Sequence, residues 1–212
     1  ALPISARKAA FEATPVLAGD LLYVVTPFNQ VIAVDPGSGA ERWRFDPQVD
    51  KTRDYSESTC RGVTVAGGMV FLGTLDARLI ALDAASGAVR WQVGIGDGAR
   101  DGNFQITSPP VVVGSTVITG SAIGDNGHAG MPRGTVRAFD AKTGKPKWSW
   151  DPTPAGMTGA ANAWSLLSAD AERDMVFIPT GSASPDFFGG LRKGDNRHAN
   201  SVVALRASTG KL

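Results

Sequence analysis

The chain has 212 residues and a mass of 22.0 kDa, a size typical of one domain or of part of a larger one. With 42% hydrophobic and 19% charged residues it can bury a core, which excludes an intrinsically disordered chain. Its 21 basic and 20 acidic residues nearly cancel, so the charge favours neither nucleic acid nor an anionic membrane surface as a partner. No apolar run approaches the roughly 18–20 residues that a transmembrane helix needs.

Glycine and proline are abundant, with 26 and 13 copies, and they divide the sequence into short β-rich runs. In chain order, these runs fall at residues 14–17, 21–26, 31–34, 42–45, 62–65, 69–74, 78–82, 89–93, 109–113, 116–120 and 175–180. No stretch long enough for a helix has convincing 3.6-residue periodicity. The sequence therefore predicts an all-β fold.

A motif of the form A-x-D-x-x-[S/T]-G-x-x-x-W occurs three times, at residues 33–43, 81–91 and 138–148. A fourth copy starts at residue 204 and reaches its glycine at Gly210. Asp and Ser or Thr side chains can accept the backbone N–H groups of a tight turn, and Gly allows the positive φ that such a turn needs. We expect each copy to be a β-hairpin whose tryptophan packs between neighbouring sheets and has no catalytic role.

Four short strands in about 45 residues are typical of one blade of a β-propeller. The copies divide the partial propeller domain, residues 1–212, into four blades at roughly 11–46, 60–94, 106–151 and 162–212. A closed ring has about four to eight blades, and the pattern starts and stops within a blade. We therefore expect the chain to be part of a larger ring.

Four segments between the repeats are rich in Gly, Pro, Asp and Asn, which predicts loops. They are residues 97–103, 125–133, 152–161 and 182–198. Long loops on a rigid scaffold are where binding groups collect, so we expect the functional residues in or beside them.

The repeat resembles the tryptophan-docking motif of the quinoprotein dehydrogenases, whose eight-bladed propellers bind pyrroloquinoline quinone (PQQ). The blocks between the repeats resemble the membrane-bound branch that acts on glucose, quinate and polyols; they lie at residues 59–63, 73–81, 106–110, 134–140 and 184–190. The resemblance covers the chain from Phe11 to Leu212. It implies that these residues are about the first four blades of an eight-bladed ring.

The same resemblance implies PQQ-dependent oxidation of an alcohol group on a sugar, a polyol or a cyclic polyhydroxy acid, with a quinone or another electron acceptor downstream. Hydride would pass to the quinone while a carboxylate base takes the hydroxyl proton, and Ca²⁺ or Mg²⁺ would polarise the quinone oxygens. In the family the base follows the fourth docking tryptophan, so we expect it beyond Leu212 and expect these residues alone to be inactive. We also expect a periplasmic location, with any membrane anchor outside this chain.

Five residues match family positions that contact the cofactor: Glu12, Arg61, Thr107, Asn162 and Trp164. The guanidinium of Arg61 can pair with a PQQ carboxylate, and the indole of Trp164, which lies outside the docking motif, can stack on the flat quinone. A purely structural role remains open for four of these residues. Glu12 could be an exposed strand-end acid, Arg61 could form a structural ion pair, Thr107 could cap a strand and Trp164 could be a core residue.

Asp125 and Ser182 match the positions of metal ligands in the family. Hard cations favour carboxylate oxygen, and Asp125 takes the place of a Glu found in the methanol-oxidising branch. The residues 125–127 (Asp-Asn-Gly) are also ordinary turn sequence. Ser182 stands where that branch has an Asn, and a serine is a poorer ligand.

Four other polar residues are expected to have no role in the chemistry. Cys60, the single cysteine, stands where the methanol-oxidising branch has two adjacent cysteines, and we expect a buried, inert thiol. Asp186 is not expected to be the catalytic base. His128 and His198 lie in loops rich in Gly and Asn, and we expect both to be solvated.

Two other functions remain open on the sequence. One is a non-enzymatic propeller of PQQ-type repeats that scaffolds protein contacts, as outer-membrane assembly factors do. The other is a propeller that binds a pyranose or polyol without a redox cofactor. A scaffold has no reason to gather Glu12, Arg61, Asp125 and Trp164 at one end of the ring axis, so their convergence would favour the enzyme.

Overall fold

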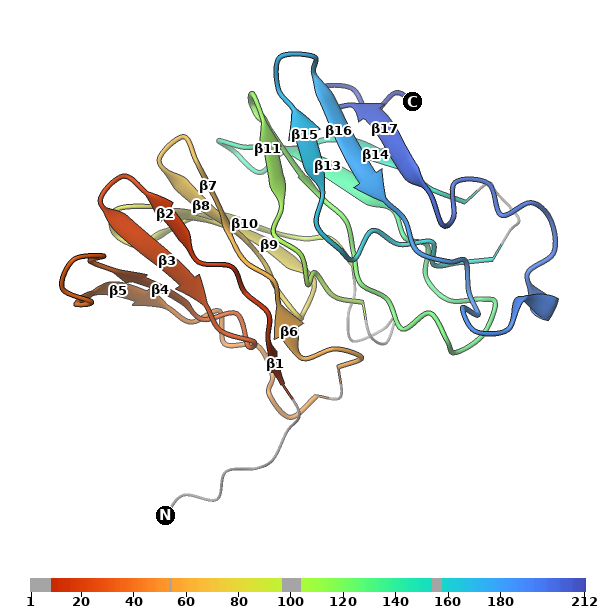
Figure 1. Ribbon diagram of the computed structural model, residues 1–212, viewed down its shortest axis with the longest axis horizontal. Helices are drawn as coiled ribbons and strands as arrows, with labels where there is room; N and C mark the ends of the chain where they lie inside the picture. The colour runs from red at the N-terminus through yellow and green to blue at the C-terminus, as the bar shows by residue number, and fades with distance from the viewer. Residues whose placement is uncertain (1–8, 54, 97–103, 154–157) are drawn as a thin grey trace.

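Four antiparallel sheets stand side by side and fan out from one another (Figure 1). The structure is a computed structural model and describes residues 9–53, 55–96, 104–153 and 158–212. The predicted loop 97–103 and part of the loop 152–161 lie outside these residues. Within the described ranges, no helix is both long and apolar enough to span a membrane. The fan of antiparallel sheets confirms the all-β propeller prediction.

The first three sheets have four strands each, and neighbouring strands follow one another in the chain. The first sheet contains β2 (Val16–Ala18), β3 (Leu21–Val25), β4 (Val31–Val34) and β5 (Glu41–Phe45). The second contains β7 (Thr64–Ala66), β8 (Met69–Gly73), β9 (Arg78–Asp83) and β10 (Val89–Gly94). The third contains β11 (Val111–Val113), β12 (Thr116–Thr119), β13 (Val136–Asp140) and β14 (Pro146–Trp150).

The fourth sheet has three strands, β15 (Ser168–Asp170), β16 (Met175–Pro179) and β17 (Val202–Arg206). A short parallel pair, β1 (Ala10–Phe11) with β6 (Thr59–Cys60), and a 3₁₀ turn at Gly189–Leu191 complete the described elements. The pair and the turn were not predicted, because runs this short carry no periodic signal.

The observed strands follow the predicted runs to within two residues. Three begin two residues later than predicted, one of them β7 at Thr64 and the other two after prolines. The run predicted at 109–113 forms a strand only from Val111, because Pro109 and Pro110 have no N–H to donate to a ladder. The run predicted at 14–17 likewise begins its strand after Pro15, at Val16.

The hydrophobic core consists of three clusters, each between two adjacent sheets. The first includes Val31 and Leu72, the second Phe71 and Val117. Because the central strands pack on both faces, β12 is buried along its whole length and β8 along nearly all of it. This explains why β8 reads as a continuous apolar run instead of alternating polar and apolar residues.

Each docking tryptophan joins its sheet to the next one. The indole N–H groups donate to backbone oxygens of the following sheet, from Trp43 to Ala84 (3.0 Å), from Trp91 to Ala141 (3.0 Å) and from Trp148 to Ala207 (2.9 Å). The ring lies directly over the turn glycine of that sheet; a Cβ at Gly87, for example, would be 2.6 Å from the Trp43 ring. The predicted role of these tryptophans between blades is confirmed.

The repeated Asp closes each of the first three hairpin turns. Asp35 Oδ1 accepts hydrogen bonds from the backbone N–H of Ser38 (2.8 Å) and from its hydroxyl (2.9 Å), and Asp35 Oδ2 pairs with Arg42 at 2.8 Å. The Arg42 guanidinium and the Ser38 donors hold the pKa of Asp35 well below its usual range. The motif therefore specifies its turn chemically.

The fourth copy of the motif has Arg206 where the others have Asp, and another residue supplies the acceptor. Asp174, in the turn between β15 and β16, accepts from the backbone N–H of Ser208 (3.0 Å) and from its hydroxyl (2.5 Å). Ser208 stands one position before the Ser or Thr of the motif, so Asp174 supports the turn from outside it, while the N–H of Gly210 still donates to Arg206 O at 2.7 Å.

The first strands of the sheets line the inside of the fan, because β2, β7, β11 and β15 contact one another from sheet to sheet. The segments that lead into them also run side by side. Backbone hydrogen bonds join Thr14 N–H to Arg61 O (3.3 Å) and Arg61 N–H to Thr107 O (2.8 Å). In Figure 1 this end, marked by β1 and β6, lies opposite the β2–β3 and β15–β16 hairpins.

Candidate functional site

Most of the predicted cofactor residues occupy equivalent positions in the repeat. Glu12, Arg61, Thr107 and Asn162 each lie a few residues ahead of the first strand of a sheet, that is, ahead of β2, β7, β11 and β15. Since the first strands line the inside of the fan, these positions meet at one end of it. The repeat itself therefore brings together residues that are far apart in the chain.

Arg61 is the centre of this group. Its Nε lies 3.0 Å from Glu12 Oε2, its Nη2 lies 3.0 Å from Glu57 Oε2, and its Nη1 donates to Thr107 Oγ1 at 2.8 Å. The guanidinium is thus held by two carboxylates and one hydroxyl. A guanidinium fixed by three partners points its remaining in-plane N–H groups in set directions, which suits pairing with a carboxylate.

Trp164 completes the group. The guanidinium carbon of Arg61 lies 5.0 Å from the centroid of the indole, a cation–π contact, and Thr107 Oγ1 lies 3.2 Å from the Trp164 carbonyl oxygen, close enough to donate to it. The Trp164 side chain is 39% exposed although its backbone is tied to the sheet before it. Glu12, Arg61, Thr107 and Trp164 therefore form one connected cluster with an open aromatic face.

A cavity of about 570 Å³ opens beside this cluster. Asp125, Asn162, Trp164, Asp186 and Phe187 are among its lining residues. Burial, with the nearby Asp186 and Glu57 carboxylates, raises the pKa of Asp125. A carboxylate in this position gains by binding a cation, because the cation offsets both the lost hydration and the like charges.

Asn162 is buried in the wall of the cavity, with 1% of its surface exposed. Its Nδ2 donates to Ser121 O at 3.0 Å, but its Oδ1 has no hydrogen-bond partner among the described residues. The buried hydroxyl of Ser121 is in the same situation. Buried polar atoms without partners are rare and unfavourable, so the Asn162 amide oxygen is suited to a ligand of the cavity, whereas Ser121 is not among the lining residues.

The side chains at the cavity offer partners for both a cation and a flat cofactor. Asp125 offers a carboxylate and Asn162 an amide oxygen, both of which suit Ca²⁺ or Mg²⁺. Among the described residues there is no cluster of three His, Cys, Asp or Glu side chains that could hold a metal. A cation at Asp125 would therefore need neutral oxygens as well. The open Trp164 face beside Arg61 fits a planar anion.

The structure does not bring Ser182 into the cavity. Its hydroxyl donates to Asn200 Oδ1 at 2.9 Å. Ser184 lies closer to the cavity loop, with its Oγ 2.9 Å from Asp125 O and 2.6 Å from His128 O. It can donate to one of these oxygens at a time and so holds the loop in place. A metal-binding role for Ser182 stays a prediction.

Three of the four residues expected to have no role in the chemistry have ordinary surroundings, with one difference; the fourth, Asp186, lines the cavity. Cys60 is 2% exposed, which confirms that it is buried, and burial raises the pKa of its thiol; its inertness stays a prediction. His128 is exposed. His198, expected to be solvated, is only half-buried and packs edge-on against Trp150 at 5.7 Å, because the long loop folds back onto β14.

Glu57 was not predicted, although it pairs with Arg61 and lines the cavity. It lies in an irregular segment ahead of β6, where no periodicity or motif separates a functional acid from a surface acid. Only its proximity in sequence to Arg61 could have drawn attention to it.

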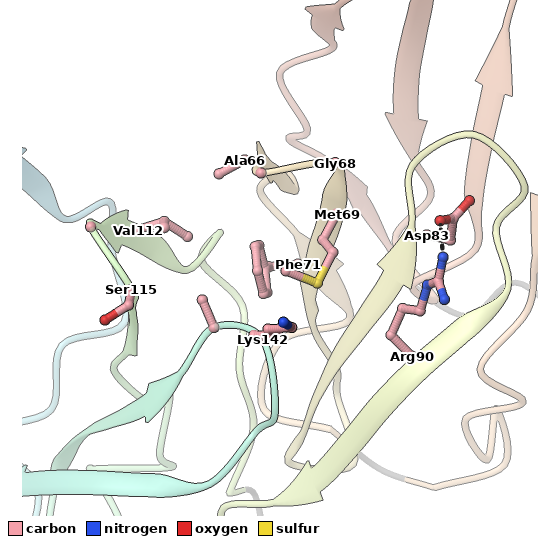
Figure 2. Close-up of a pocket in the computed structure, with 12 residues that line it drawn as sticks. Ala66, Gly68, Met69, Phe71, Asp83, Arg90, Val112, Ser115 and Lys142 are labelled. Atoms are coloured by element: carbon pink, nitrogen blue, oxygen red, sulfur yellow. Dashed lines mark hydrogen bonds and ion pairs between the residues drawn. The ribbon is translucent and has the colours of Figure 1, made fainter.

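A larger hollow of about 710 Å³ lies elsewhere, at the hairpin end between the second and third sheets. Figure 2 shows Phe71 and Met69 within it, with Val112 on one side and the Asp83–Arg90 ion pair on the other. A smaller hollow with equivalent turn residues lies between the first and second sheets. The repetition indicates that this is a groove of the blade architecture, remote from the Arg61 cluster.

Comparisons with known proteins agree with this geometry. A family described as "PQQ: Glucose/ethanol/alcohol dehydrogenase, beta-propeller domain" matches residues 3–212. The quinoprotein glucose dehydrogenase A of Acinetobacter calcoaceticus is 34% identical over 95% of this chain and 30% of its own length. The quinate/shikimate dehydrogenase (quinone) of Acinetobacter baylyi is 33% identical over 94% of this chain and 30% of its own length.

Among solved structures, the quinohemoprotein alcohol dehydrogenase ADHIIG of Pseudomonas putida HK5 superposes with a TM-score of 0.86 at 31% identity. The match covers 96% of this chain and 33% of that one. The chain thus spans about a third of the length of the relatives that it matches.

Proposed function

The chain belongs to the PQQ-type glucose/ethanol/alcohol dehydrogenase β-propeller family, and from that premise we propose that it forms one side of the cofactor site of a quinoprotein dehydrogenase. The proposed reaction is oxidation of an alcohol group on a sugar, a polyol or a cyclic polyhydroxy acid. The observation that carries the proposal is the connected cluster of Arg61, Thr107 and Trp164 beside the cavity of Asp125 and Asn162.

The residues of this chain would bind and orient the cofactor. Trp164 would pack its indole on one face of the flat ring system, and Thr107 would steady the Trp164 backbone. Asp125 and the Asn162 amide oxygen would hold the cation at the cavity wall. When bound, PQQ would accept hydride and a Ca²⁺ or Mg²⁺ ion would polarise its quinone oxygens.

Arg61 would provide the selectivity for an anion. Two carboxylates, Glu12 and Glu57, already pair with it, so a carboxylate of the cofactor must share the guanidinium with them or displace one of them. The Glu12 and Glu57 side chains are 41% and 48% exposed and can swing into solvent at little energetic cost. We therefore expect the ion pair of Arg61 with Glu12 or with Glu57 to break when the cofactor binds.

Further blades are part of the proposal, since the chain matches about a third of its relatives' length. The tryptophan of the preceding sheet packs on each of the turn glycines Gly87, Gly144 and Gly210. No described residue packs on the equivalent glycine of the first sheet, since a Cβ at Gly39 would have no described atom within 4 Å. The first sheet thus offers the same turn surface to a neighbour outside this chain. A periplasmic location and a quinone or other electron acceptor also remain proposals.

The convergence of Glu12, Arg61 and Trp164 supports the enzyme over a protein-interaction scaffold. A scaffold gains nothing from an aromatic face and a triply held guanidinium at one end of the axis. The polar lining of the cavity by Asp125 and Asn162 supports the same choice.

The test is cofactor binding by the native protein that contains this chain. PQQ would be added with Ca²⁺ or with Mg²⁺, and binding would be followed by quenching of tryptophan fluorescence and by dye reduction with alcohol substrates. Replacing Trp164 by alanine is expected to weaken PQQ binding by about tenfold. Phe188→Ala, which removes an exposed aromatic outside the cavity lining, is expected to leave binding unchanged. Equal affinity of the wild type and Trp164→Ala would refute the assigned site.

A further inference from the structure

Two phenylalanines in the loop before the 3₁₀ turn are unusually exposed, Phe187 at 88% and Phe188 at 66%. Their surroundings differ. Phe187 lines the cavity that also contains Asp125 and Trp164, whereas Phe188 does not. The Phe188 ring instead folds over the 3₁₀ turn, since a Cβ at Gly190 would lie 2.6 Å from it. Of the two, only Phe187 is a lining residue of the cavity.

The backbone that carries Phe187 is firmly held. Its own N–H donates to Asn126 Oδ1 at 3.2 Å, and the N–H of Asp186 donates to Asp125 O at 3.0 Å. Arg192 Nη2 donates to Asp186 O at 3.1 Å from the other side. A braced backbone holds residue 187 beside the cavity, so its exposure does not come from a loose loop.

An aromatic ring at the mouth of a polar cavity suits one kind of ligand. Cyclic polyols combine an apolar face of ring C–H groups with a rim of hydroxyl groups. Such a molecule can place its C–H face on a phenyl ring while its hydroxyls reach polar groups of the cavity wall that are not assigned to the cation, such as Asp186. An acyclic alcohol such as glycerol has no comparable face.

We propose that Phe187 is a specificity-determining residue that stacks on the ring of a cyclic substrate. This inference rests on the proposed function, which places the cofactor on Trp164 and the cation at Asp125, so that the alcohol would approach them through this cavity. Within the proposed sugars, polyols and cyclic polyhydroxy acids, it favours substrates with a six-membered ring over acyclic polyols. The phenyl ring acts by binding and orienting the substrate and takes no part in proton transfer.

The experiment compares Phe187→Ala with Phe188→Ala in the native protein. For a ring substrate, glucose or quinate, Phe187→Ala is expected to raise KM about tenfold relative to its effect on glycerol. Phe187→Tyr keeps the aromatic face and is expected to restore selectivity. Phe188→Ala is expected to leave the ratio of the two substrates unchanged. Equal effects of Phe187→Ala on ring and acyclic substrates would overturn the proposal.

A second readout is independent of turnover. Saturation-transfer NMR would report contact between the ring C–H protons of glucose or quinate and the protein. The signal is expected with the wild type and Phe188→Ala and is expected to be lost with Phe187→Ala. A wild type that binds the ring but oxidises nothing would refute the proposed function and leave the Phe187 contact standing. Signals unchanged by Phe187→Ala would refute the contact.

Discussion

Replacing Gly144 by alanine is expected to destabilise the protein far more than replacing Gly114, although both glycines lie in turns of the third sheet. Their φ values are +71° and +56°, so alanine at either position adopts a left-handed conformation that costs about 1 kcal/mol. The surroundings decide the rest. A Cβ at Gly144 would be 2.8 Å from the Trp91 ring, whereas a Cβ at Gly114 would have no described atom within 4 Å.

The additional cost at Gly144 follows from how the indole is held. Trp91 cannot move aside freely, because its N–H donates to Ala141 O at 3.0 Å and its ring packs against Phe71 at 6.0 Å. Overpacking of this kind costs about 1–3 kcal/mol. We therefore expect losses of about 3 kcal/mol for Gly144→Ala and about 1 kcal/mol for Gly114→Ala.

The assay is denaturant unfolding of the native protein, followed by tryptophan fluorescence, with both variants measured together. In a Trp91→Ala background the clash is absent, so Gly144→Ala should then cost only about 1 kcal/mol. Equal losses for Gly144→Ala and Gly114→Ala would refute the docking argument. Gly39→Ala extends the test: a loss like that of Gly144 would support a further blade at the first sheet, and a loss like that of Gly114 would count against one.

The remaining predictions concern titratable groups. Cys60 is expected to resist thiol reagents at pH 8 in the folded protein and to react on unfolding. The reason is that Cys60 is 2% exposed and that burial raises the pKa of its thiol. Rapid labelling of the native protein would contradict this prediction. The Arg90 guanidinium and Ser86 hold the pKa of Asp83 at about 2. This lowered pKa contributes stability above the unfolded value of about 3.9, and the contribution is lost as pH falls through about 2. Asp83→Asn should therefore lower the denaturation midpoint at neutral pH and have no such effect below pH 2.

The blade architecture could be predicted from the sequence because it depends on local chemistry. The Asp, Ser or Thr and Gly of each motif define a turn, and the apolar runs on either side define its strands. The register of Trp91 relative to that turn also follows from the motif. These features require only neighbours in the chain, and the structure bears them out at the first three motifs.

The tertiary structure alone decided the composition of the site. Arg61 was predicted as an anion-binding residue, yet its pairing with Glu57 carried no sequence signal. The separation of Ser182 from the cavity, and the use of Asp174 in place of an Asp at position 206, were equally invisible in the sequence. Each depends on how segments from different blades approach one another, and that approach is set by packing between sheets, which no short stretch of sequence encodes.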